Sequence, residues 1–168
     1  RLPVGRGDQV VLTTVETIQR LHDFSPPSVQ HPLDVRFGNR ARLVGYDLRT
    51  ATARPGGSLT LVLHWQALET FDHNYVVFTH LVTADNRIVG QRDQVPGNGA
   101  YPTTSWIPDE YLTDAYAILV NPDTPPGDYW IEIGFYDPLD GARLPVTDGQ
   151  PLGNRLLLKE TPVRVPAQ

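Results

Sequence analysis

The stretch 58–91 constrains the fold most strongly, because it holds two long apolar runs and a shorter third joined by polar connections. In residues 58–66 apolar side chains recur at every second position, which is the period of a strand with one buried face. Residues 74–83 are apolar on both faces, which predicts a central strand covered on both sides. A short polar turn then leads into a returning strand at 87–91. The stretch predicts an antiparallel meander with Trp65 on its buried face.

The other apolar runs show the same period of two, and no segment sustains the 3.6-residue period of a helix. Further strands are predicted over residues 9–16, 41–48, 113–120, 128–137, 142–146 and 154–165. Pro and Gly residues separate these runs, as they do between the strands of all-β proteins. The sequence therefore predicts an all-β fold: an antiparallel two-sheet β-sandwich, immunoglobulin-like or jelly-roll-like, with about eight to ten strands.

Composition limits the size of the domain and excludes several classes of function. A chain of 168 residues is long enough for one domain with a full core and short for two. A net charge of -5 without a basic cluster argues against a nucleic-acid partner and against direct binding to an anionic membrane. The chain has no Cys, which excludes disulfides and thiolate chemistry.

The N-terminal part of the chain contains half of an internal repeat. Residues 1–4 (RLPV) are identical to residues 143–146, and the apolar run at 8–12 matches the run at 154–158. The repeat predicts that residues 1–20 are the last hairpin of a preceding similar unit. The alternative is that they provide an edge strand of this sandwich.

The remaining boundaries follow from the spacing of prolines and apolar residues. Residues 21–36 are rich in Pro and show no period, so they are predicted to be a linker or an extended strap. Residues 37–168 are predicted to form the sandwich domain. The chain has no Met, and we expect it to be a piece cut from a longer protein.

A series of short motifs runs in order through residues 37–165. It comprises FG at 37–38, LVGYDL at 43–48, PG at 55–56, LHWQA at 63–67, YVVFTHL at 75–81, QRD at 91–93, YPT at 101–103, Trp106, Asp114, PPGDY at 125–129 and GFYD at 134–137. The series resembles the extracytoplasmic C-terminal β-sandwich domain of uncharacterised bacterial membrane proteins. Many of those proteins look like polytopic glycosyltransferases of the protein-mannosyl- or aminoarabinose-transferase type.

This resemblance implies a non-catalytic accessory domain at the cell surface or on the outer face of the cytoplasmic membrane. The partners it implies are a carbohydrate or glycolipid and the neighbouring domains of the same chain. Contact with the membrane would run through the parent protein, whose membrane part would carry any transfer chemistry. The family offers no assigned catalytic residues, so none is predicted here.

The longest irregular stretch, residues 92–111, holds three candidate ligand-binding residues. Asp93 opens the stretch and would bind a ligand at the rim of the sandwich, or else would accept backbone N–H bonds and fix the loop. Tyr101 and Trp106 offer aromatic faces suited to stacking on a sugar, or else fold inward as a lid over one end of the sandwich.

Three further candidates, Trp130, Glu132 and Tyr136, alternate with the apolar residues of the strand predicted at 128–137. If the apolar residues face the core, these three form an aromatic and acidic stripe on the outer face of the sheet. Such a stripe fits an extended glycan or another domain. The alternative is that the Pro-rich linker or a neighbouring unit covers it.

No cofactor is predicted. The nearest approach to a metal set is His64, His73 and His80, which lack carboxylates at ligand spacing and so predict no metal site. A Ca²⁺ site that combines backbone carbonyls with Asp93 or Asp109 would leave no sequence signature and stays open. The alternative function is a small hydrolase or a metal-dependent enzyme on the sandwich. A pocket with a buried carboxylate beside His64 or His80 would favour that alternative.

Overall fold

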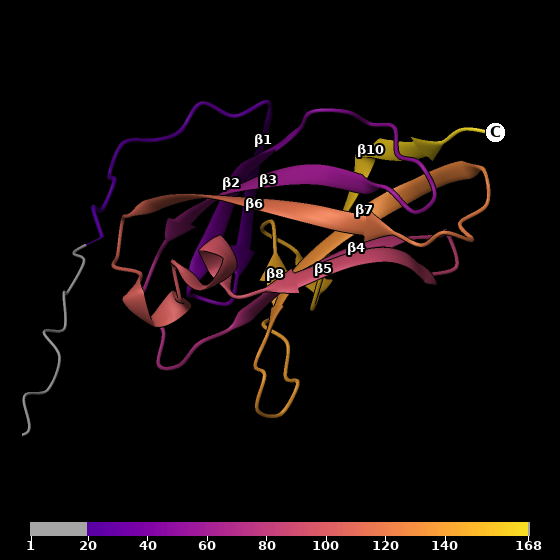
Figure 1. Cartoon of the computed structure of the whole chain (residues 1–168). Helices are drawn as coiled ribbons and strands as arrows, with labels where there is room; N and C mark the ends of the chain where they lie inside the picture. The colour runs from indigo at the N-terminus through magenta and orange to yellow at the C-terminus, as the bar shows by residue number, and fades with distance from the viewer. Residues whose placement is uncertain (1–19, 168) are drawn as a thin grey trace, which may run out of the picture.

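The computed structural model describes residues 20–167, and its regular structure is antiparallel β apart from two short 3-10 turns (Figure 1). The two turns, η1 (Pro96–Gly99) and η2 (Thr103–Ser105), lie between β5 and β6. The ten strands are β1 (His31–Phe37), β2 (Ala41–Leu48), β3 (Ser58–Ala67), β4 (Val76–Val82), β5 (Ile88–Gln94), β6 (Tyr111–Val120), β7 (Gly127–Tyr136), β8 (Val146–Thr147), β9 (Pro151–Gly153) and β10 (Leu156–Val165). Within the described part of the chain, no helix is long and apolar enough to cross a membrane.

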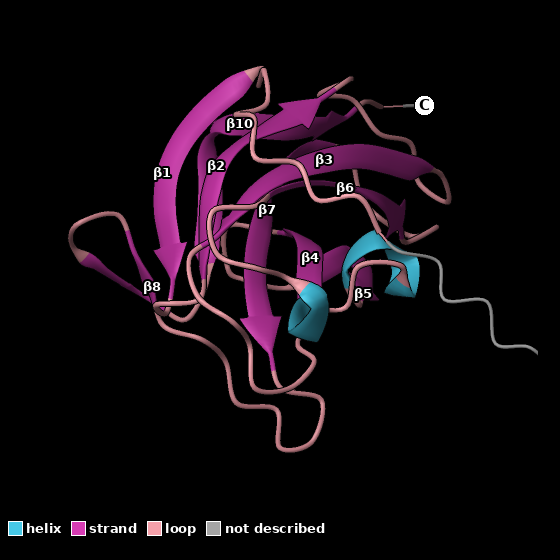
Figure 2. Ribbon diagram, turned by 90° about the vertical axis from the view of Figure 1, so that its left-hand side faces the viewer, coloured by secondary structure: helices cyan, strands magenta, loops and turns pink. Residues whose placement is uncertain are grey.

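The strands are hydrogen-bonded in the order β10-β7-β4-β5-β6-β3-β2-β1-β8-β9, which folds over into two layers (Figure 2). The fold-over lies between β5 and β6, which share the two residue pairs Gly90–Val120 and Gln91–Leu119. Glycine permits this close crossing, because a Cβ on Gly90 would lie 2.7 Å from the carbonyl oxygen of Leu119. One layer is therefore β10-β7-β4-β5, and the other is β6-β3-β2-β1 with the β8–β9 hairpin.

An apolar core fills the space between the two layers. Phe135 of β7 contacts Phe37 of β1 and Trp65 of β3 edge to face, with ring centroids 5.6 and 4.9 Å apart. Each such contact contributes about 0.5–1.5 kcal/mol beyond the burial of the rings. Trp65 is 0% exposed, which confirms its predicted place in the core. The antiparallel β-sandwich predicted from the sequence is confirmed as well.

Strand β1 corrects the predicted linker at 21–36. Residues 31–37 pair with β2 along their length and turn Val35 and Phe37 into the core. The apolar alternation is short, and Pro32 interrupts it, so the sequence pattern alone resembles a linker. Proline is tolerated in β1 because it removes a backbone donor at a position where a strand edge is open.

The segment before β1 lies against the sandwich as a strap, defined as residues 20–30. Asp23 in the strap pairs with Tyr111 at the start of β6. The backbone N–H of Gln30 donates to the Asp47 carboxylate at 2.6 Å, which fixes the other end of the strap. The strand predicted over 9–16 lies outside the described residues, so the repeat stays a prediction.

Candidate functional site

The outer face of β7, β4 and β5 gathers charged and aromatic side chains. His80 of β4 lies opposite Glu132 of β7, and Phe78 of β4 lies opposite Asp93 of β5. Side chains directly opposite each other in an antiparallel pair point to the same face of the sheet. Gly134 lies opposite Phe78 on β7, and the Phe78 ring occupies the space that a Cβ on Gly134 would need. The ring therefore lies low on the sheet and leaves room above it.

His80 forms the centre of a chain of ionic hydrogen bonds. Its Nδ1 lies 3.0 Å from a carboxylate oxygen of Glu132, and its Nε2 lies 3.0 Å from a carboxylate oxygen of Asp93. The other oxygen of Glu132 accepts a hydrogen bond from Arg155. Arg155 in turn donates to the side-chain oxygen of Asn86 at 2.7 Å. The chain of hydrogen bonds links three strands, the β4–β5 turn and the connection that precedes β10 across the outer face.

The two central members of this chain carry opposite charges at neutral pH. Burial of His80 opposes its charge, but the hydrogen bonds to Asp93 and Glu132 raise the pKa of His80 from 6.5 to about 9. Burial likewise opposes the charge of Glu132, but His80 and Arg155 hold the pKa of this carboxyl below its usual value. His80 is thus an imidazolium that donates from both ring nitrogens.

Next to His80 lies an open hollow of about 240 Å³, which we call the outer pocket. The guanidinium of Arg143 lies 4.2 Å from the centre of the Phe78 ring, a distance at which the cation and the ring attract each other. Burial and the charge of Asp93 raise the pKa of the Tyr136 phenol, which therefore keeps its proton. The pocket is lined by Phe78, His80, Asp93, Tyr136, Gly141 and Arg143.

Four of the six predicted ligand-binding residues lie on this face. Asp93 and Tyr136 line the outer pocket. Glu132 lies beneath it at 4% exposure, so it positions His80 and is not on the surface as the stripe predicted. Trp130 is half-buried on the same face of β7, about 20 Å along the strand from Tyr136. Asp93 belongs to β5 itself, which corrects its predicted place in the loop.

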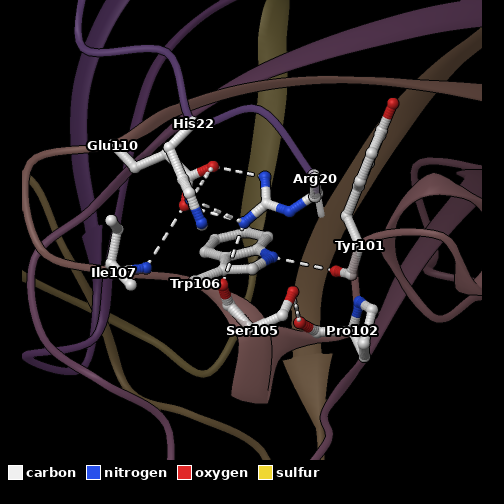
Figure 3. Close-up of polar contacts among 8 residues, drawn as sticks. All are labelled: Arg20, His22, Tyr101, Pro102, Ser105, Trp106, Ile107 and Glu110. Carbon is white, nitrogen blue, oxygen red and sulfur yellow. Dashed lines mark hydrogen bonds and ion pairs between the residues drawn. The ribbon is translucent and has the colours of Figure 1, made fainter. Parts of the chain in front are cut away.

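The other two predicted residues, Tyr101 and Trp106, lie in the loop between β5 and β6 (Figure 3). Trp106 is 1% exposed and packs against Trp65 and Phe71 in the core. Its indole N–H donates to the carbonyl of Tyr101 at 2.9 Å. The Tyr101 ring lies 5.4 Å from the guanidinium carbon of Arg20. These contacts match the inward-folded lid, and the predicted sugar-stacking role of Trp106 is corrected because its faces are covered.

Arg20 fastens the strap to this lid, as Figure 3 shows. Its guanidinium donates to both oxygens of Glu110 and to the carbonyl of Ser105. His22 adds a contact of 3.0 Å to the same carboxylate. Glu110 is 0% exposed; burial opposes its charge, but Arg20 and His22 lower the pKa of this carboxyl. The cluster is a structural clamp that leaves the carboxylate without free lone pairs for a ligand.

The histidines do not assemble a metal set. His64 of β3 and His80 of β4 lie on strands that β6 and β5 separate. His64 bonds instead to Asp47 at 3.0 Å and to Thr113 at 3.1 Å. Over residues 20–167, no three His, Asp or Glu side chains converge to hold a metal ion. Glu132 and Asp93 contact the two different nitrogens of the His80 ring, on opposite sides of it. These carboxylates therefore do not converge with His80 on a single metal position.

Sequence reasoning missed the partners of His80 and the role of Arg143. The pairing of His80 with Glu132 depends on the register of β4 against β7, which spans 52 residues of chain. A weak signal was present, since His80 and Glu132 each occupy a position inside an otherwise apolar strand. Buried charges of this kind are normally paired. The need of each buried group for a partner would therefore have predicted that His80 and Glu132 form a pair.

The outer face of β7, β4 and β5 thus carries a small polar and aromatic pocket beside the ionic hydrogen bonds of His80. A scan against protein-family models finds no match, and a search of curated proteins finds none either. Among solved structures, the chain is similar to the C-terminal domain of Wzt, with 12% sequence identity and a TM-score of 0.54. The alignment covers 82% of this chain and 83% of that one. At this identity the likeness establishes the β-sandwich fold.

Proposed function

We propose that this domain is a non-catalytic binding module that holds one sugar residue of a glycan in the outer pocket. The observation that supports the proposal is the set of groups around one open hollow of about 240 Å³. The Asp93 carboxylate accepts hydrogen bonds, whereas Arg143 and the Tyr136 hydroxyl donate them. Sugar hydroxyls need both kinds of partner, and a sugar's C–H surface suits an aromatic wall.

The outer pocket does have a buried carboxylate, that of Glu132, beside His80, which is the arrangement expected of the enzymatic alternative. The protonation states nevertheless favour binding over catalysis. A general base must hold a free lone pair near neutral pH. Both ring nitrogens of His80 are engaged, and its pKa of about 9 keeps it charged. The Glu132 carboxylate is ionised, but His80 and Arg155 occupy both of its oxygens. These groups hold the pocket in shape and do not move protons.

The wider role in the proposal is that of an accessory domain outside the cytoplasmic membrane. The motif series at 37–165 supports this compartment through its resemblance to extracytoplasmic C-terminal sandwiches. In this role the module brings a surface glycan or glycolipid to neighbouring domains of the parent protein. A glycosyltransferase-like membrane part in that parent is the finer form of the proposal.

The test is binding of the wild-type protein to a panel of bacterial surface polysaccharides by glycan array. We expect binding to fall at least about tenfold in both pocket variants. Arg143→Gln removes the positive charge and shortens the donor group, and Tyr136→Phe removes the hydroxyl donor. Leu139→Ser is the matched control, because Leu139 lies in the neighbouring turn and is 86% exposed. Unchanged binding in both pocket variants would refute this site, and no binding to any polysaccharide would refute the function.

A further inference from the structure

A second and larger groove lies on the opposite side of the sandwich from the β5–β6 fold-over. It measures about 580 Å³ and runs between β1 and the β8–β9 hairpin on one side and β10 on the other. His31 and Tyr46 form its floor as a stacked pair 4.6 Å apart. Its walls carry Leu33, Leu152 and the six consecutive residues 155–160.

The consecutive lining shows that the groove exposes the edge of β10 and not one of its faces, because side chains of successive strand residues point to opposite sides. One edge of β10 pairs with β7. On the other edge, residues 51–53 bond to Arg164. Within residues 20–167 no strand pairs with that edge between Leu156 and Pro162. Unpaired strand edges of this kind are templates for an added strand.

The facing edge of β1 is a poorer template. β1 pairs with β8 at Arg36 and Phe37, which leaves its first residues open toward the groove. Pro32 within that part has no backbone N–H to donate. An added strand would therefore bond to β10 and pack its side chains against the apolar wall opposite.

We infer that this groove binds an extended polypeptide strand, and that residues 9–16 of a second copy of the chain supply it. The segment reads QVVLTTVE, with four apolar residues and two Thr, a composition that favours strands. Its eight residues span about 26 Å, which is long enough to cover the roughly 17 Å of groove-lining edge from Leu156 to Glu160. Nineteen residues precede Arg20, so the segment belongs to the part of the chain outside the described residues.

The same chain does not reach its own groove with this segment. Arg20 is fastened to Glu110, and the strap lies beside β6 through the Asp23–Tyr111 pair. Four strand spacings separate the N-terminal end of the strap, at Asp23, from β1, about 19 Å across the layer. The four Cα–Cα steps from Glu16 to Arg20 span at most about 14 Å. In Figure 2 the start of the described chain and strand β1 lie on opposite sides of the molecule.

The test uses the full chain and measures molecular mass against concentration by sedimentation. We expect the wild type to associate weakly, with a dissociation constant on the order of 0.1 mM. Thr13→Pro removes a backbone donor from the segment, and Leu152→Arg places a charge in the groove at a residue that is 39% exposed. Each variant alone should associate at least about tenfold more weakly than the wild type.

A mixture of the two variants separates this mechanism from a general loss of association. Thr13→Pro keeps an intact groove and Leu152→Arg keeps an intact segment, so the mixture should form dimers that do not grow further. Tyr136→Phe, in the outer pocket, should associate like the wild type. A wild type that stays monomeric up to about 1 mM would overturn the inference. So would a loss of melting temperature in monomeric Thr13→Pro, because that would place the segment in its own chain's fold.

Discussion

Replacing His80 with Gln removes the charge that joins Asp93 to Glu132. The rise in the pKa of His80 from 6.5 to about 9 corresponds to about 3 kcal/mol of stability at 1.36 kcal/mol per pKa unit. Because the folded-state pKa is raised, this stability is fully present below pH 6.5 and is lost as pH rises through about 9. We therefore expect His80→Gln to cost about 3 kcal/mol at pH 6 and far less near pH 9.5.

The assay is urea unfolding at several pH values between 6 and 9.5, followed by tryptophan fluorescence, since Trp65 and Trp106 are buried. Gln91→Ala is the control, because Gln91 lies opposite His80 on β5 and does not titrate. Its free energy of unfolding should change with pH in parallel with that of the wild type. A constant difference between wild type and His80→Gln across this pH range would show that His80 is not charged in the folded protein.

Substitutions at three other residues test the clamp at Glu110, the lid at Trp106 and the Phe78 floor of the outer pocket. Arg20→Gln should lower the free energy of unfolding by about 3 kcal/mol, because it leaves the buried Glu110 with His22 as its remaining side-chain partner; chemical denaturation at pH 7 measures this. Trp106→Ala should cost about 3–5 kcal/mol from the cavity it creates, and Trp106→Phe, which should still fold, should leave glycan binding unchanged on the array. Gly134→Ala should cost about 1–3 kcal/mol by displacing the Phe78 ring, and a melting curve with unaltered stability would contradict the packing described here.

The sequence predicted those parts of the fold that depend on local alternation. Residues 58–66 and 74–83 carry long runs with a clear period, and both form strands within a residue or two of the predicted bounds. β1 was missed because its buried positions, Val35 and Phe37, are too few to establish a period beside Pro32. The short strands of the β8–β9 hairpin depend on pairing with neighbours more than on their own residues.

The candidate site was predictable one side chain at a time but not as an assembly. Alternation along one strand correctly places Trp130 and Tyr136 on the outer face of β7. Alternation along one strand does not determine the register between strands. It therefore could not predict that His80 contacts both Asp93 and Glu132. Trp106 illustrates the opposite failure, because an irregular loop has no period that would separate a buried aromatic from an exposed one.

Nuclear magnetic resonance can locate a bound glycan on the surface of the protein and so tests whether it occupies the outer pocket. The measurement is a titration of the ¹⁵N-labelled protein with a polysaccharide that binds on the array. We predict that the backbone signals of Asp93, Tyr136 and Arg143 shift together and saturate, while those of Leu152 and Lys159 in the groove stay in place. Saturable shifts confined to the groove, or to any face other than that of β7, β4 and β5, would contradict glycan binding in the outer pocket.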